Sequence, residues 1–320
     1  MGFGMNKMLL GVAVAGALAM SSVANAAATL DWTSLVAAGP LPTGVTNTTK
    51  DADGDSLVKG INPSTGLPNT TAGILEVGDY IKGVYDYIRV ANSGVAGFPG
   101  TTIGAGTAYS ELTGVSLIKV LTKVPGSTLG TFNFTFGPDT AKFATEFGFA
   151  VPAGTISRVF DDFSQNFSLS GTIATSVASA TNGAIAGNFG FTGAGGTAVA
   201  GEGWQVLGGT DNFSLLPGVD TSFTLGTANF ALNRTDSAGF VGSLLLVKQP
   251  TALFGGTAEF LGSSTIQGSL GASTPWQGIS QTNLQFVAAV PVPTAAWMGL
   301  SSLALMGVGY AGRKLRKTAL

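Results

Sequence analysis

The chain contains neither cysteine nor histidine. Without cysteine it has no disulfide bonds and no thiol nucleophile, and without histidine it cannot assemble a Ser-His-Asp triad. A zinc site with His or Cys ligands is excluded for the same reason. The two absences therefore remove thiol enzymes, triad hydrolases and small zinc modules from the possible functions.

Charged residues are also scarce, at 10% of the 320 residues against about 25% in a typical domain. All 17 acidic residues but only 10 of the 15 basic residues lie between residues 27 and 290, so this body has a net charge of 10 − 17 = −7. Nucleic-acid binding needs clustered Lys and Arg, and this balance argues against it. The apolar content of 45% is too high for a disordered chain.

The first 26 residues have the three parts of a secretory signal peptide. Lys7 supplies a positive charge, residues 8–20 are an apolar run, and Ala24 and Ala26 form an A-x-A cleavage site. An apolar run of about 13 residues is too short to span a bilayer comfortably. The sequence predicts export through the Sec translocon and a mature chain that begins at Ala27.

The last thirty residues combine prolines, an apolar segment and a basic cluster in that order. Pro291 and Pro293 prevent a helix from extending toward the N-terminus. Residues 295–312 carry no charge, and as a helix these roughly 18 residues would cover some 27 Å of a bilayer core of about 30 Å. The basic cluster is Arg313, Lys314, Arg316 and Lys317. A buried helix, a permanent membrane anchor and a sorting signal all fit this order, and the basic end of a spanning helix would face the cytoplasm.

Residues 290–297, V-P-V-P-T-A-A-W, followed by the apolar segment and R-K-L-R-K, resemble the PEP-CTERM family of bacterial sorting tails. The similarity is to the variants in which a second proline pair replaces Pro-Glu-Pro. The resemblance implies that an exosortase, a membrane-embedded transpeptidase-like enzyme, recognises Val290, Pro291 and Pro293 and cleaves the chain nearby.

The same resemblance assigns roles to the rest of the tail. Trp297 is implied to be the aromatic residue at the membrane entrance, residues 295–312 a transient transmembrane anchor, and the basic cluster a retention signal. Met298 follows the tryptophan where the family usually has Leu. Members of the family belong to Gram-negative bacteria that produce exopolysaccharide, which implies a location in the envelope, on the cell surface or in the extracellular matrix.

The body, residues 27–289, alternates apolar and polar residues between turns that contain Gly or Pro. About ten such segments predict an all-β fold, a sandwich or a jelly roll. In one of them Phe132, Phe134 and Phe136 share a face. The predicted strands are residues 80–90, 112–124, 131–136, 166–174, 203–207, 212–215, 221–225, 228–232, 241–247 and 284–289.

One helix interrupts this pattern at residues 139–147, with Asp139 as a possible N-cap and Gly148 as its end. Residues 178–203, rich in Ala, Gly, Thr and Asn, predict either a flexible excursion or edge strands with small side chains.

The best candidate for a metal site is the run Asp51, Asp53 and Asp55, in which oxygen ligands alternate and Gly54 permits a tight turn. A hard cation such as Ca²⁺ is the expected ligand. The run lacks the later Gly and Glu of a complete EF-hand loop. The alternative is a solvated acidic turn.

Catalysis by paired carboxylates would have to use Asp161, Asp162 and Glu146, since glycosidases need two carboxylates about 5–10 Å apart. Neighbouring residues of a strand point to opposite faces, so Asp161 and Asp162 are expected in a surface turn rather than in an active site. The tryptophans could stack on sugars or lie in the core; three of them are Trp32, Trp204 and Trp276.

These features predict an exported, non-enzymatic protein of the bacterial surface or matrix that an exosortase sorts. One alternative is a secreted carbohydrate- or calcium-binding β-sandwich module, and a second is a polysaccharide hydrolase. No cofactor other than a possible Ca²⁺ is expected. The expected partners are the Sec translocon, the exosortase, the membrane and exopolysaccharide, and not nucleic acid.

Overall fold

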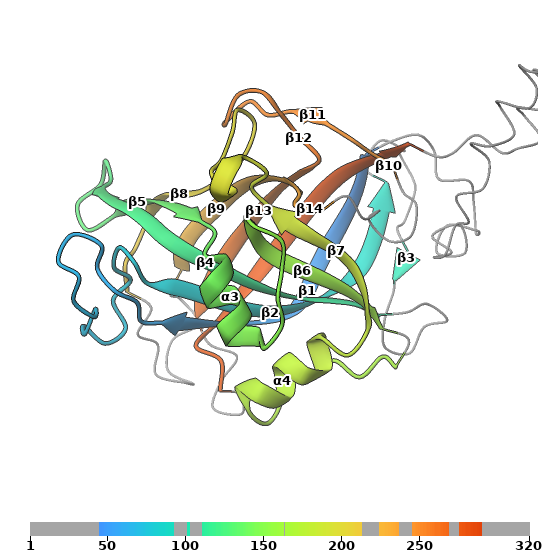
Figure 1. The fold of residues 1–320 in the computed structure, drawn as a ribbon, viewed down its shortest axis with the longest axis horizontal. Helices are drawn as coiled ribbons and strands as arrows, with labels where there is room; N and C mark the ends of the chain where they lie inside the picture. Colours follow the sequence, from blue (N-terminus) through green and yellow to red (C-terminus); the bar gives the residue numbers. More distant parts are fainter. Residues whose placement is uncertain are drawn as a thin grey trace, which may run out of the picture. The chain divides into compact units, whose positions relative to one another are not determined.

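The computed structural model describes residues 45–92, 101–102, 111–162, 164–212, 224–236, 245–268 and 275–289. All of them belong to one compact unit, residues 30–289, drawn as the coloured ribbon in Figure 1. The strands are β1 (Val45–Val58), β2 (Tyr80–Asn92), β3 (Thr101–Thr102), β4 (Glu111–Pro125), β5 (Phe132–Gly137), β6 (Thr155–Asp162), β7 (Ala184–Gly190), β8 (Gly203–Gly209), β9 (Thr224–Arg234), β10 (Leu245–Val247), β11 (Gln249–Pro250), β12 (Thr257–Ala258), β13 (Phe260–Gly268) and β14 (Gly278–Ala289). The helices are α3 (Thr140–Phe147), α4 (Ile173–Ala180) and the short 3₁₀ turn η1 (Ala194–Gly196).

Within the described residues, twelve strands form one antiparallel sheet that closes on itself. Its hydrogen-bonded order is β3-β2-β1-β14-β13-β9-β7-β6-β4-β5-β8, and the additional pairings β2–β4 and β8–β9 complete the ring β1–β14–β13–β9–β8–β5–β4–β2. A ring of about eight strands has an interior just wide enough for side chains to fill. The all-β prediction is confirmed. The predicted sandwich would have two separate sheets, whereas here one continuous sheet encloses the core.

Strand β4 holds the ring together because it changes partner along its length. Its first half, residues 111–116, pairs with β6, and its second half, residues 119–125, pairs with β5. On its other side β4 pairs with β2 from Leu112 to Lys119. Strands β6 and β7 thus form a second connection between β4 and β9.

Alternation along the strands separates two hydrophobic clusters. The inner cluster lies on the enclosed face and includes Ile81, Phe134, Val159, Phe230 and Phe286, all buried. The predicted shared face of β5 is confirmed, because Phe134 and Phe136 belong to this cluster and Phe132 packs against it. Since successive residues of a strand point to opposite faces, the residues between them form a second cluster outside the ring.

The outer cluster lies between the sheet and the two helices. It joins Val84 of β2, Val115 of β4 and Phe160 of β6 to Phe143 of α3 and Ala180 of α4. Figure 1 shows α3 and α4 lying against the outside of these strands. The strands are therefore buried on both faces where the helices cover them.

The predicted helix is confirmed together with both of its ends. Helix α3 begins after Asp139, whose side chain accepts a hydrogen bond of 3.1 Å from the backbone N–H of Lys142. It ends at Gly148, which adopts the left-handed conformation with φ of 80° that favours glycine. Helix α4 uses a different cap, because Thr172 and Thr175 exchange hydrogen bonds as a capping box.

Two predictions about residues 161–174 are wrong. Residues 166–174 form no strand: residues 165–169 have no regular structure and Ile173 begins α4, because the capping box at Thr172 starts a helix there. Asp161 and Asp162 do not lie in a surface turn but end β6, where both are buried. All eight residues of β6 are buried, so the strand has no exposed face to give it a period of two.

Candidate ligand cavity

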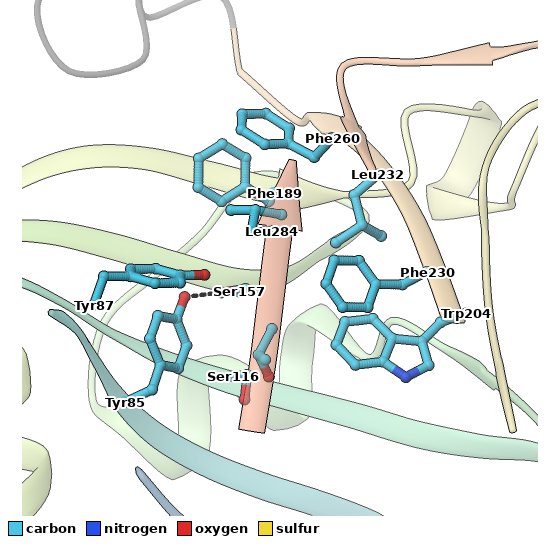
Figure 2. Close-up of a pocket in the computed structure, with 11 residues that line it drawn as sticks. Tyr85, Tyr87, Ser116, Ser157, Phe189, Trp204, Phe230, Leu232, Phe260 and Leu284 are labelled. Carbon is cyan, nitrogen blue, oxygen red and sulfur yellow. Dashed lines mark hydrogen bonds between the residues drawn. The ribbon is translucent and has the colours of Figure 1, made fainter. Parts of the chain in front are cut away.

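A small cavity of about 50 Å³ lies inside the closed sheet. Its walls come from strands β2, β4, β6, β7, β8, β9, β13 and β14 (Figure 2). Six lining residues are aromatic: Tyr85, Tyr87, Phe189, Trp204, Phe230 and Phe260. The other five are Ser116, Ser157, Leu232, Thr282 and Leu284. A cavity of this size holds about three to four water molecules.

One wall of the cavity is apolar and aromatic. The indole of Trp204 stacks on Phe230 with ring centroids 4.4 Å apart and planes at 19°. Phe189 and Phe260 pack at 4.5 Å and 57°, a tilted geometry typical of attractive ring pairs. Figure 2 shows Leu232 between these two pairs, so they form a continuous apolar surface.

The opposite wall carries hydroxyl groups (Figure 2). The hydroxyls of Tyr85 and Ser157 are hydrogen-bonded to each other, and Tyr87 packs edge-on against Tyr85 with centroids 5.2 Å apart. Thr282, which also lines the cavity, donates a hydrogen bond of 2.8 Å to Ser264. The cavity is therefore two-sided: one wall is apolar, and the other, which includes the rings of Tyr85 and Tyr87, carries neutral hydroxyl groups.

Burial raises the pKa of Tyr85 well above its usual value, and its hydrogen bonds with Ser157 and Tyr87 offset only part of this effect. A tyrosine is protonated at neutral pH even at its usual pKa of about 10, and the raised pKa keeps the phenol of Tyr85 in this form over a wider pH range. It acts in the cavity as a neutral polar group, not as a base.

Glycine residues make room for this wall. A Cβ atom at Gly114 of β4 would lie 2.4 Å from the ring of Tyr85, and one at Gly83 of β2 would lie 2.6 Å from Oγ of Ser116. Any larger residue at either position would push a lining side chain into the cavity. The cavity thus depends on backbone positions that offered no signal in the sequence beyond a high glycine content.

The predicted acidic metal run lies in strand β1, not in a turn. Asp53 pairs with Tyr85 and Asp55 with Gly83 in the ladder with β2. Asp55 is buried, and the side chains of Asp51 and Asp53 lie outside the described residues. Among the side chains that the structure does describe, no group of three or more acidic residues is arranged to hold a metal ion. Calcium binding at this run stays a prediction.

The predicted catalytic carboxylates have structural partners. Glu146 on α3 forms ion pairs with Lys82 at 3.1 Å and with Lys142 at 2.7 Å. Asp162 accepts a hydrogen bond from the backbone N–H of Ser164 and lies opposite Glu111 in the β4–β6 ladder. Burial raises the pKa of Glu111, while backbone hydrogen bonds from the loop after β6 oppose the shift. These carboxylates hold secondary-structure elements together.

The tryptophans that the structure describes are not exposed stacking platforms. Trp276 is completely buried in the outer cluster, and its indole N–H donates a hydrogen bond of 3.2 Å to Ser176 of α4. Trp204 is half-buried on the cavity wall. Trp32 lies outside the described residues.

The predicted sorting and export residues also lie outside the described residues: Ala24, Ala26, Val290, Pro291, Pro293, Trp297, Arg313, Lys314, Arg316 and Lys317. In the part of the chain that the structure describes, no helix combines the length and apolar character needed to cross a membrane. Comparisons of this chain with models of known protein families, with curated proteins and with solved structures find no match.

Proposed function

We propose that this chain is an exported, non-enzymatic protein of the bacterial envelope, cell surface or extracellular matrix, sorted by an exosortase. The observation that carries the proposal is the order of features in residues 290–320: a paired-proline motif, an uncharged segment of transmembrane length and a basic cluster. The signal-peptide pattern of residues 1–26 gives the same destination. Association with exopolysaccharide is the role that fits such a destination.

The body favours a structural role because its best-connected buried carboxylates are hydrogen-bonded within the protein and fix its loops. Asp79 is fully buried and accepts hydrogen bonds from Lys59 at 2.6 Å, from Asn69 at 2.8 Å and from the backbone N–H groups of Gly60 and Glu76 at 2.9 Å. A buried carboxylate that is satisfied in this way fixes the loop between β1 and β2. It has no lone pair directed to a substrate.

Glu202 plays the same part at the other end of the sheet. Its carboxylate accepts hydrogen bonds from Asn233 of β9 at 2.7 Å and from the backbone N–H groups of Thr192 and Val199 at 3.1 and 3.2 Å. It thereby fastens the segment that contains η1 to strand β9. These contacts favour a durable body over a reactive one.

The intact mass of the protein, recovered from the bacterium that makes it, tests the proposal. We expect a mature form that starts near Ala27 and ends near residues 291–297, and we expect the full tail to be retained when Pro291 and Pro293 are both replaced by Ala. Thr294→Ala is the matched control within the motif and should leave processing intact. A native chain that still carries residues 313–320 would show a permanent anchor and contradict sorting by cleavage.

The alternatives predict other outcomes. A calcium-binding module should gain thermal stability in millimolar Ca²⁺, and Asp53→Ala should abolish that gain. A polysaccharide hydrolase should release sugars from a glycan panel and lose that activity when one carboxylate among Asp161, Asp162 and Glu146 is replaced by its amide. We expect neither effect.

A further inference from the structure

We propose that the cavity inside the closed sheet binds a compact, neutral and largely apolar molecule that carries one oxygen group, a hydroxyl or a carbonyl. The inference goes beyond the route of export and does not depend on it. It rests on the two-sided lining of the cavity and on the hydroxyl of one lining residue, Ser116.

The lining residues define the charge of the ligand. Among the described residues that line the cavity there is no Lys, Arg, Asp or Glu. A charged molecule would lose its hydration there without gaining a counter-charge, which is strongly unfavourable in an apolar interior. The ligand class is therefore neutral.

Two lining residues have polar groups that the protein leaves unused. The hydroxyl of Ser116 has no hydrogen-bond partner among the described residues, and the buried indole N–H of Trp204 has none either. By contrast, Ser157 is bonded to Tyr85, and Thr282 to Ser264. The indole N–H of Trp204 is fully buried and out of reach of a molecule in the cavity. The hydroxyl of the half-buried Ser116 is therefore the group that can bond with such a molecule.

The same two residues are the accessible part of the lining. Ser116 and Trp204 are half-buried, whereas the other nine lining residues are buried. Ser116 keeps this accessible surface although its neighbours on β4, Val115 and Leu117, are buried. A small molecule in the cavity would thus meet the hydroxyl of Ser116 and the apolar part of the Trp204 ring, whose N–H is fully buried.

The volume limits the size of the ligand. About 50 Å³ accommodates a molecule of roughly four to five non-hydrogen atoms, fewer than the six of the benzene guests of larger engineered cavities. The aromatic wall favours a hydrocarbon body, and Ser116 supplies one hydrogen bond to its oxygen. Cyclobutanol has these properties and serves as the probe, and cyclobutane is its counterpart without oxygen.

NMR titration of the full chain with each probe tests the proposal. We expect saturable shifts of the methyl signals of Leu232 and Leu284 with cyclobutanol, with affinity on the order of millimolar. Ser116→Ala should weaken the binding of cyclobutanol about fivefold, because one neutral hydrogen bond is lost, and should change the binding of cyclobutane less than about twofold.

A space-filling variant provides the second test. Leu232→Phe places extra volume in the cavity and should weaken both probes by about tenfold or more. Leu207→Phe is the matched control, because Leu207 is 54% exposed on the outside of β8. A dispersed spectrum shows that each variant is folded, and if Leu232→Phe is not, the Ser116→Ala comparison decides alone.

Three results would overturn the proposal. They are an absence of saturable shifts up to the solubility limit of both probes, an equal response of both probes to Ser116→Ala, or equal losses from Leu232→Phe and Leu207→Phe. Each would mean that the cavity is a packing imperfection or that the probes bind only to the surface.

Discussion

The two faces of strands β2, β4 and β6 are packed in different ways. Outside the ring, Trp276 fills the space between the sheet and α4, and its N–H is hydrogen-bonded to Ser176. Inside the ring, Trp204 borders a cavity, and its N–H has no partner among the described residues. The same strands therefore support one sealed cluster and one that retains space. The outer cluster serves stability, and the inner cluster offers room for a ligand.

Replacing each of the two tryptophans by alanine should give the largest difference in stability loss between the inner and outer clusters. Trp276→Ala removes a fully buried side chain from the sealed cluster and should cost about 3–5 kcal/mol of unfolding free energy. Trp204→Ala removes a half-buried ring next to existing space and should cost about 1–2 kcal/mol. Urea denaturation measures both losses. Equal losses would mean that the inner and outer clusters are equally tight.

Adding one methyl group to each face should give a smaller difference. A Cβ atom at Gly54 would lie 2.3 Å from Cγ of Trp276, which is completely buried, so Gly54→Ala should cost about 2–3 kcal/mol. At Gly114 the added atom would lie 2.4 Å from the ring of Tyr85, which borders the cavity. Gly114→Ala should therefore cost only about 1 kcal/mol. Thermal unfolding of the two variants measures the difference, and a larger loss at Gly114 would contradict it.

The N-caps of the two helices on the outer face should differ in how their contributions to stability depend on pH. Burial favours a higher pKa for Asp139, but hydrogen bonds from the Lys142 backbone, Tyr80 and Lys119 outweigh this effect. The pKa of Asp139 in the folded protein is therefore lowered. A carboxyl with a lowered pKa stabilises the fold fully when the pH is above its pKa in the unfolded chain, about 3.9. This stabilisation is lost as the pH falls through its pKa in the folded protein. Asp139→Ala should cost about 1–2 kcal/mol at pH 7 and less in acid.

The control for this effect is the cap of the other helix. Thr172 caps α4 without a charge, so Thr172→Ala should cost about 1 kcal/mol at every pH. Urea denaturation at pH 7 and near pH 3 compares the two variants. If both losses changed alike with pH, the charge of Asp139 would not be the cause.

The sequence predicted those elements whose signals are local. Asp139 and Gly148 mark both ends of α3, and the alternating Phe132, Phe134 and Phe136 mark β5. Strand β6 was missed because burial on both faces removes the period of two. Strand β1 was missed because Asp51, Asp53 and Asp55 are poor strand formers that pairing with β2 and β14 overrides.

The cavity could not have been predicted in the same way. Its lining runs from Tyr85 to Leu284 and comes from eight strands, and only closure of the sheet brings these strands together. Tyr85 and Tyr87 show the period of two but do not reveal which wall they face. The site is a property of the register between strands, which a single sequence specifies only weakly.

The closure of the sheet also determines which strand pairs can form early in folding and which must form late. Strand β1 pairs on one side with β2, which follows closely in the chain, and on the other side with β14, where Thr48 lies opposite Leu284, 236 positions later (284 − 48). At a synthesis rate of about 5–20 residues per second, that partner arrives roughly ten to fifty seconds after β1. Until then one edge of β1 exposes unpaired backbone groups that can bind another chain. The risk of aggregation for this protein therefore depends on how long the edge of β1 stays unpaired before β14 binds to it.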